Sequence, residues 1–155
     1  MRIALGSIAV LLAFLASSCN KKCANLTSSI DGAIEATYQF GDCDFFAAID
    51  SNVIIRNQLE FDTFVQQKMK NCSSLNTIPA VDFQKNSLIG NMVSTPACNI
   101  AFKRNLTVDH AAKTYTYTIT TEKCTGCNQL LRSPNFVLTP PIPTNYTINW
   151  VVIDP

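Results

Sequence analysis

A regular alternation of residue types over residues 113–122 constrains the fold of this chain more than any other feature. The apolar members of the alternation lie on one side of an extended strand: Tyr115, Tyr117 and Ile119. The preceding segment, 100–108, also places its apolar residues on one side: Phe102, Leu106 and Val108. These two sides face a common core only if the segments form a hairpin that turns at about residues 109–112. The chain is therefore expected to fold around an antiparallel sheet.

The rest of the chain predicts one helix and several short strands. Asn57 followed by Glu60 is typical of a helix N-cap. Apolar residues then recur at helical spacing: Phe61, Phe64, Val65 and Met69. Short strands are expected over residues 52–56, 87–93, 136–138 and 146–153, and a cysteine-bearing loop over 124–135. One helix packed on a mostly antiparallel sheet (a meander), bridged by disulfides, is an α+β fold.

The first eighteen residues have the order of a secretory signal peptide. Arg2 precedes an uncharged run of fourteen residues, 3–16. That run is shorter than the roughly 20 helical residues needed to cross a bilayer. Small residues follow it and end at Cys19, as in a cleaved export signal. We therefore expect residues 1–18 to be removed, residues 19–36 to form a tether, and residues 37–155 to form one α+β domain.

The segment that ends the signal peptide, Leu15-Ala16-Ser17-Ser18-Cys19, resembles the lipobox of bacterial lipoproteins. In that family the cysteine receives a diacylglycerol and becomes the mature N-terminus. The resemblance implies lipidation of Cys19, a stable anchor of several acyl chains, and a location in the bacterial cell envelope. Asn20 stands where an aspartate would resemble an inner-membrane retention signal, which favours the outer membrane, on either of its faces. The alternative is an ordinary secretory signal with Cys19 in a disulfide.

The charge balance argues against binding modes that depend on a strong electrostatic field. The chain has 12 Lys+Arg and 11 Asp+Glu, and removal of residues 1–18 takes away Arg2 and leaves no net charge. Proteins that neutralise nucleic-acid phosphates carry a basic excess instead. The expected partners are therefore the lipid bilayer, through acylated Cys19, and another protein of the envelope, with no nucleic acid.

Six cysteines remain once Cys19 is assigned to the lipid. They are Cys23, Cys43, Cys72, Cys98, Cys124 and Cys127. An even set in an exported chain predicts disulfides. The preferred arrangement ties Cys23 to Cys43 near the tether, with the other four paired among themselves around the ends of the hairpin.

Two other uses of these cysteines are open from the sequence. The last four of them supply enough thiolates for a tetrahedral zinc site, but an oxidising compartment favours disulfides. Cys124-Thr-Gly-Cys127 has the C-x-x-C spacing of thiol oxidoreductases, but no long helix follows it before Pro134. We therefore expect no metal and no other cofactor, and keep the redox role as an alternative.

No residue stands out as catalytic. Asp42 and Asp44 lie in a turn-like segment that lacks the further carboxylates of a calcium loop. His110 is expected at the tip of the hairpin, where a histidine is solvated, and Asp82 at a turn or the start of a strand. The sequence has none of the common nucleophile, zinc-protease or phosphate-loop motifs.

Three segments of the chain carry a resemblance to a known family. Residues 53–65 read VIIRNQLEFDTFV, residues 79–85 read PAVDFQK and lead into Ser87-Leu-Ile-Gly90, and a closing strand carries Trp150-Val-Val. They resemble the C-terminal domain family of PrcB, a lipoprotein-like subunit of a bacterial surface protease complex. The resemblance covers about residues 52–153. It implies a subunit that assembles or stabilises other envelope proteins, and it implies no catalytic residues.

The sequence thus predicts a membrane-anchored, non-enzymatic envelope lipoprotein that binds or stabilises another protein, such as a protease or a surface complex. The Pro-rich segment 139–143 lies beside an expected sheet edge, and a free edge accepts a partner strand. The alternatives are an extracytoplasmic thiol-redox protein that uses Cys124 and Cys127, and a secreted glycoprotein. The glycoprotein alternative depends on four N-x-Ser/Thr sequons, at Asn25, Asn71, Asn105 and Asn145.

Overall fold

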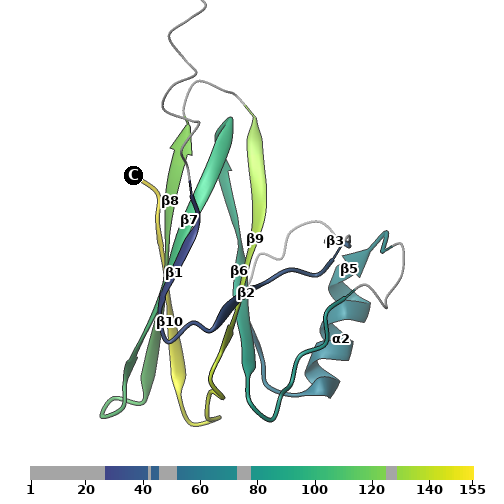
Figure 1. Cartoon of the computed structure of the whole chain (residues 1–155), viewed down its shortest axis with the longest axis vertical. Coiled ribbons are helices and arrows are strands. Elements are labelled where there is room, and N and C mark those ends of the chain that lie inside the picture. Colours follow the sequence, from purple (N-terminus) through teal and green to yellow (C-terminus); the bar gives the residue numbers. More distant parts are fainter. Residues whose placement is uncertain (1–26, 42, 46–51, 73–77, 125–128) are drawn as a thin grey trace, which may run out of the picture.

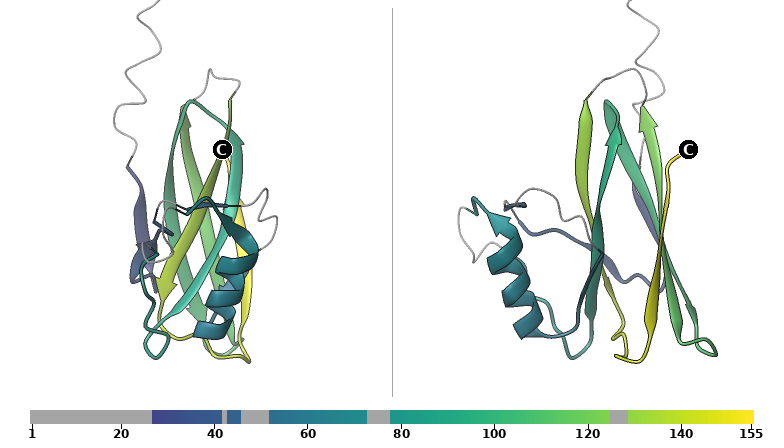
Figure 2. Two further views of the ribbon diagram at one scale, coloured as in Figure 1. Left: turned by 90° about the vertical axis from the view of Figure 1, so that its right-hand side faces the viewer. Right: turned by 180° about the vertical axis from the view of Figure 1, so that it is seen from behind.

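The strands that the structure describes divide between two four-stranded sheets that face each other and a small two-stranded sheet. The computed structural model describes residues 27–41, 43–45, 52–72, 78–124 and 129–155. Helix α2 (Gln58–Lys68) covers the face of one four-stranded sheet that is turned away from the other (Figures 1 and 2). We call that sheet the middle sheet and the other the outer sheet. The described residues therefore form three layers.

The outer sheet is built around the predicted hairpin. Its strand order is β1 (Ser29–Gly32), β7 (Asn99–Asp109), β8 (Thr114–Cys124) and β10 (Thr147–Ile153). β7 and β8 pair antiparallel with Leu106 opposite Tyr117, and both side chains are fully buried, which confirms the predicted faces. Val108 differs, because it lies next to the hairpin turn and is 37% exposed. β1 and β10 flank the hairpin, and each runs parallel to its neighbour.

The middle sheet is buried on both faces. Its strand order is β2 (Ala36–Tyr38), β9 (Leu130–Thr139), β6 (Ser87–Pro96) and β4 (Val53–Ile55), all antiparallel. On β6, Leu88 packs in the cluster under α2 and Ile89 packs in the cluster between the sheets, and neither is exposed. Gly90 follows, where a Cβ atom would lie 2.5 Å from the ring of Phe136. The close approach of β9 therefore excludes any side chain at this position.

Two apolar clusters hold the three layers together. The cluster between the two sheets is centred on side chains of β6, β7, β8 and β9: Ile89, Val93, Phe102, Leu106, Tyr117, Ile119 and Val137. The cluster between the middle sheet and α2 is rich in aromatic rings: Tyr38, Phe40, Phe61, Phe64 and Phe136, with Ile55 and Leu88. The helix therefore packs on the middle sheet through the apolar positions that the sequence predicts for it.

The N-cap prediction for α2 is confirmed in atomic detail. The Asn57 side chain accepts a hydrogen bond from the Glu60 backbone N–H at 2.9 Å, and the Glu60 carboxylate accepts one from the Arg56 N–H at 2.7 Å. The first bond satisfies an N–H group that a helix start otherwise leaves free, and the second ties the residue before the cap to the first turn. The helix leads directly into β5 (Met69–Lys70), which pairs with β3 (Asp44–Phe45) to form the small sheet.

The fold class is confirmed in its coarse outline and corrected in its layout. One helix, many strands and a disulfide are present in the described residues, but the structure is more sheet-dominated than an α+β fold. Two facing sheets replace the single meander. The reason lies in β6, whose residues 87–90 are all buried, because a strand that is buried on both faces needs a layer on each side.

Two segments expected outside the sheets are strands. Residues 29–32 belong to the tether that the sequence predicts, but they form β1 and continue the outer sheet beyond β7. Residues 130–135 were expected in a loop, but they belong to β9 and pair along β6. Pro134 is compatible with this strand because β2 pairs only with residues 136–138, which leaves Pro134 at an edge of the middle sheet.

Candidate functional site

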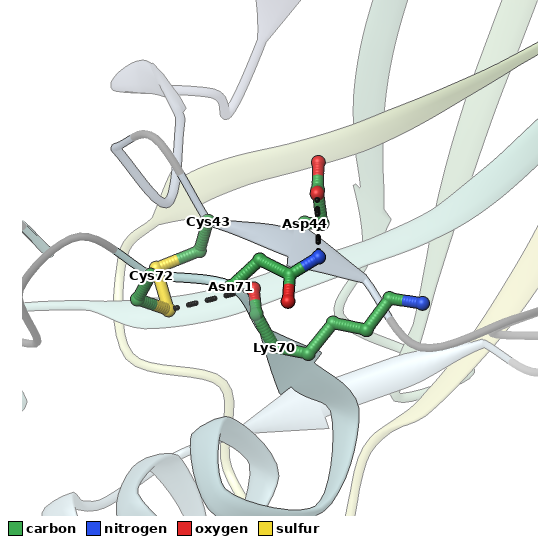
Figure 3. Close-up of a disulfide and its surroundings, with 5 residues drawn as sticks. All are labelled: Cys43, Asp44, Lys70, Asn71 and Cys72. Atoms are coloured by element: carbon green, nitrogen blue, oxygen red, sulfur yellow. Dashed lines mark hydrogen bonds between the residues drawn. A yellow bond between two sulfur atoms is a disulfide. The ribbon is translucent and has the colours of Figure 1, made fainter.

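The structure corrects the predicted disulfide pattern. Cys43 is bonded to Cys72, with 4.2 Å between their Cα atoms, and not to Cys23 (Figure 3). The cause is the pairing of β3 with β5, which places Asp44 opposite Lys70 and brings the residues next to them together. Asn71 adds a side-chain hydrogen bond to Asp44 at 3.2 Å. The bond therefore fastens the end of α2 to the chain that leads in from β2.

The remaining cysteines are only partly within the described residues. Cys98 and Cys124 are disulfide-bonded, and the Cys98 N–H also donates to the Cys124 carbonyl at 3.1 Å where β7 and β8 meet. Cys19, Cys23 and Cys127 lie outside the described residues. Because Cys72, Cys98 and Cys124 are all in disulfides, they do not supply the thiolates of the zinc site that the sequence left open. Among the described residues, no group of three or more His, Cys, Asp or Glu side chains is placed to hold a metal ion.

The other residues singled out from the sequence make local contacts where the structure describes them. The Asp82 carboxylate accepts a hydrogen bond from the Gln84 N–H at 3.1 Å and forms an ion pair with Lys85. These contacts confirm that Asp82 belongs to a turn. His110 is exposed beside the hairpin turn and lies 3.2 Å from the Tyr146 hydroxyl. Asp42 lies outside the described residues.

The first candidate site is the free edge of β10. This strand pairs with β8 on one side and ends the outer sheet on the other. Ile148 and Trp150 pack against the core between the sheets. The last three residues of the strand are large, apolar and exposed: Val151 (38%), Val152 (47%) and Ile153 (46%). The edge thus combines a row of backbone groups without a partner strand in the described structure with an aliphatic surface.

Asp154 holds the end of β10 in place. Its carboxylate accepts hydrogen bonds from Thr95 of the middle sheet (3.1 Å) and Thr121 of the outer sheet, and it pairs with Lys123 at 2.8 Å. Hydrogen bonds from Lys123 and Thr121 lower the pKa of Asp154 below its ordinary value, and Thr95 adds to the effect. One carboxylate therefore ties the end of the β10 edge to both sheets.

The second candidate site is a cavity of about 420 Å³ at the opposite side of the molecule, near the β1–β7 side of the outer sheet. Aromatic rings form much of its wall: Tyr38, Phe40, Phe45 and Phe102. Its polar lining includes Ser28, Gln39, Ser133 and Arg104, and it includes no acidic residue among the described ones. Burial raises the pKa of Tyr38 to about 12, and the Tyr38 hydroxyl donates to the Pro79 carbonyl.

Arg104 is the charged group of this cavity. Its side chain leaves β7 on the face turned toward the middle sheet, and the residue is only 8% exposed. Its Nε donates to Asn135 Oδ1 at 2.9 Å, and its guanidinium carbon lies 5.1 Å from the centre of the Phe102 ring. Burial lowers the pKa of the Arg104 guanidinium, and the nearby Tyr117 acts in the opposite direction. No carboxylate of the described residues forms an ion pair with Arg104.

Sequence reasoning missed Arg104. The signal was present, because Arg104 lies midway between Phe102 and Leu106 and therefore on the side of β7 that faces the core. A charged residue in an apolar phase of a strand indicates either an edge or a buried polar contact. Arg104 makes a buried polar contact, since the side chain that accepts its hydrogen bond, Asn135 on the facing sheet, is fully buried.

Comparison with known proteins adds no identification. No family model, no curated protein and no solved structure matches this chain. The likeness to the C-terminal domain family of PrcB therefore stays a prediction from the short segments that carry it. In the part of the chain that the structure describes, no helix has the length and apolar character needed to cross a membrane.

Proposed function

We propose that this chain is a membrane-anchored, non-enzymatic lipoprotein of the bacterial envelope that binds another envelope protein by accepting an extended strand at the free edge of β10. The observation that carries the proposal is that this edge is apolar and has no partner strand among the described residues. The anchor is Cys19, at the end of the leader, and the outer membrane is the proposed location.

The composition of β10 supports a binding role for its edge. Natural sheets protect exposed edges with charged residues, with proline or with bulges, because a bare edge pairs with other chains. The strand reads TINWVVI and contains neither a charge nor a proline. An added strand would gain main-chain hydrogen bonds along the edge, and the aliphatic residues would favour an apolar partner sequence.

The rigidity of the edge supports the same role. Trp150 packs edge-on against the buried Tyr117, with ring centres 5.6 Å apart, and Asp154 fixes the strand end. An edge that is already held in the extended conformation loses little entropy when a second strand pairs with it. This favours strand addition over a partner that must first reorganise the sheet.

The first test places a photo-crosslinking amino acid at position 151 of the full-length chain in its native membrane. One partner should be captured in stoichiometric yield, and its crosslinked peptide should map to an extended segment. The same probe at position 108, an exposed valine of β7, is the matched control and should not capture that partner. Equal capture from both positions would contradict docking at β10.

A paired variant tests whether the edge itself matters. Val151→Lys together with Ile153→Lys introduces charges on the edge and should abolish capture, whereas Val108→Lys should leave it unchanged. A second copy of this chain is another occupant that would fit the same edge. Dimerisation that V151K/I153K abolishes would assign the edge to self-association and overturn the proposed partner.

The anchor is tested separately by the intact mass of the protein from the membrane fraction. A mature N-terminus at Cys19 that carries a thioether-linked diacylglycerol is the expected result. Cys19→Ala should release the protein from the membrane. A mature N-terminus without the lipid would overturn the anchor.

A further inference from the structure

We propose that the cavity beside Arg104 binds a small organic monocarboxylate with an apolar body. The inference is independent of the β10 edge, because β10 and the cavity lie at opposite edges of the outer sheet. It depends on three features of the described residues: the buried guanidinium, the absence of an acidic group in the cavity lining, and the aromatic walls.

The first step is the charge of Arg104. An arginine stays protonated in proteins, so burial leaves a positive charge in a region of low dielectric. Buried charges are ordinarily paired with an opposite charge. Here the compensation from the protein consists of a neutral amide oxygen of Asn135 and the face of the Phe102 ring. An anion in the cavity would supply the opposite charge that the described residues do not.

The second step is the geometry of the free donors. The guanidinium has five N–H groups, and in the structure Nε is the nitrogen that donates to a protein acceptor. Asn135 is held in the matching orientation, because its own amide donates to the Ser133 carbonyl at 3.1 Å and turns its oxygen toward Arg104. The terminal nitrogens remain for a planar acceptor, and a carboxylate fits two parallel N–H groups of an arginine.

The third step is the character of the walls. Rings of Phe40, Phe45 and Phe102 line the cavity, and its volume of about 420 Å³ lies within the range of small-molecule sites. A highly charged anion such as phosphate would meet only one cation and these apolar rings. A monocarboxylate with an aromatic or aliphatic body would match both parts of the lining, and Ser28 and Ser133 would provide hydroxyl groups near its polar end.

The experiment uses the full chain and three probes: benzoate, its neutral isostere benzamide, and acetate. Binding is followed by NMR shifts of the Arg104 side chain and of the cavity residues. Benzoate should bind and shift the Arg104 Nε resonance. Benzamide, which lacks the carboxylate, and acetate, which lacks the aromatic ring, should each bind at least about tenfold more weakly. Equal affinity for benzoate and benzamide would overturn the proposal.

Matched variants locate the site. Arg104→Met should weaken benzoate binding at least about tenfold, whereas Arg132→Met, at an exposed arginine of β9, should leave it unchanged. Should Arg104→Met fail to fold, Ser133→Phe fills the cavity, keeps Arg104 and should also abolish binding. Benzoate binding that survives Ser133→Phe, or acetate that binds as tightly as benzoate, would contradict a carboxylate site with apolar walls.

Discussion

Arg104 places a positive charge between the two sheets, beside the apolar cluster that fills much of the space between them. The strand periodicity fixes which way the side chain points, but it says nothing of what the side chain meets there. The acceptor, Asn135, comes from a segment that the sequence analysis treated as a loop. The position of Arg104 could therefore be predicted from the sequence, and its environment could not.

Asp154 provides the prediction at the residue scale. Asp154→Asn should lower the free energy of unfolding by about 1 kcal/mol at pH 7, because it weakens a charge-assisted contact to Lys123 and hydrogen bonds to two buried threonines. Urea unfolding measures the difference, and Asp62→Asn, at an exposed site on α2, is the control that should change little.

The same variant has a defined pH dependence. The pKa of Asp154 is lowered in the folded state, so its contribution to stability is full above the unfolded pKa of about 3.9. The contribution is lost as the pH falls from there through the folded pKa. The stability difference between the wild type and Asp154→Asn should therefore shrink below about pH 4. A difference that stays constant down to pH 2 would show that the carboxylate charge is not involved.

At the scale of the element, α2 is the part of the fold that the sequence predicts best. Its capping residues and its apolar spacing are local signals, and both operate in the structure as expected. β9 shows the opposite case. The sequence predicts a cysteine-bearing loop over 124–135, whereas residues 130–135 form a strand because β6 supplies a partner from far away in the sequence.

The cap of α2 gives an element-scale prediction. Asn57→Ala should destabilise the protein by about 1 kcal/mol, because it removes the side-chain acceptor for the Glu60 N–H. Gln66→Ala, on the exposed side of the same helix, is the control and should change the stability by less than about 0.5 kcal/mol. Both are measured by urea unfolding. An Asn57→Ala variant as stable as Gln66→Ala would show that the cap contributes nothing.

The Cys43–Cys72 disulfide gives a second element-scale prediction. Replacing Cys43 and Cys72 by serine should cost about 3 kcal/mol, because the bond closes a loop with a sequence separation of 29 residues. Peptide mapping of the non-reduced protein should first recover Cys43 and Cys72 in one linked pair. Recovery of Cys43 linked to Cys23 would restore the pairing predicted from the sequence and contradict the structure. The Cys43–Cys72 pairing could not be derived from the sequence, because it depends on the pairing of β3 with β5, two strands of two residues each.

At the scale of the whole molecule, the middle sheet packs against the outer sheet on one face and against α2 on the other. Local patterns predict most of the long strands, but they do not predict the division of these strands between two facing sheets. The evidence for a middle layer lay in β6, where consecutive residues are apolar or small and none alternates with a charged one. Which strands cover its two faces depends on long-range pairing and cannot be derived from local pattern.

The layered arrangement predicts that neighbouring residues of β6 are both core residues. Leu88→Ala and Ile89→Ala should each cost about 2–5 kcal/mol, although the two side chains point to opposite faces. On β8, by contrast, Tyr117 is buried and the neighbouring Thr118 is half-buried on the other face of the outer sheet, which no layer of the described residues covers. Thr118→Ala should therefore cost far less than either β6 variant. A small effect of Leu88→Ala in urea unfolding would contradict the packing of α2 on the middle sheet.

The parallel pairing of β10 with β8 determines the order in which the chain can fold. β10 follows its partner β8 in the sequence, so the hairpin of β7 and β8 can form before the strand that covers its second edge has been synthesised. Pairing between distant segments is slow, and an uncovered strand edge is prone to aggregation while it waits. The second edge of β8 therefore stays uncovered until residues 147–153 can pair with it.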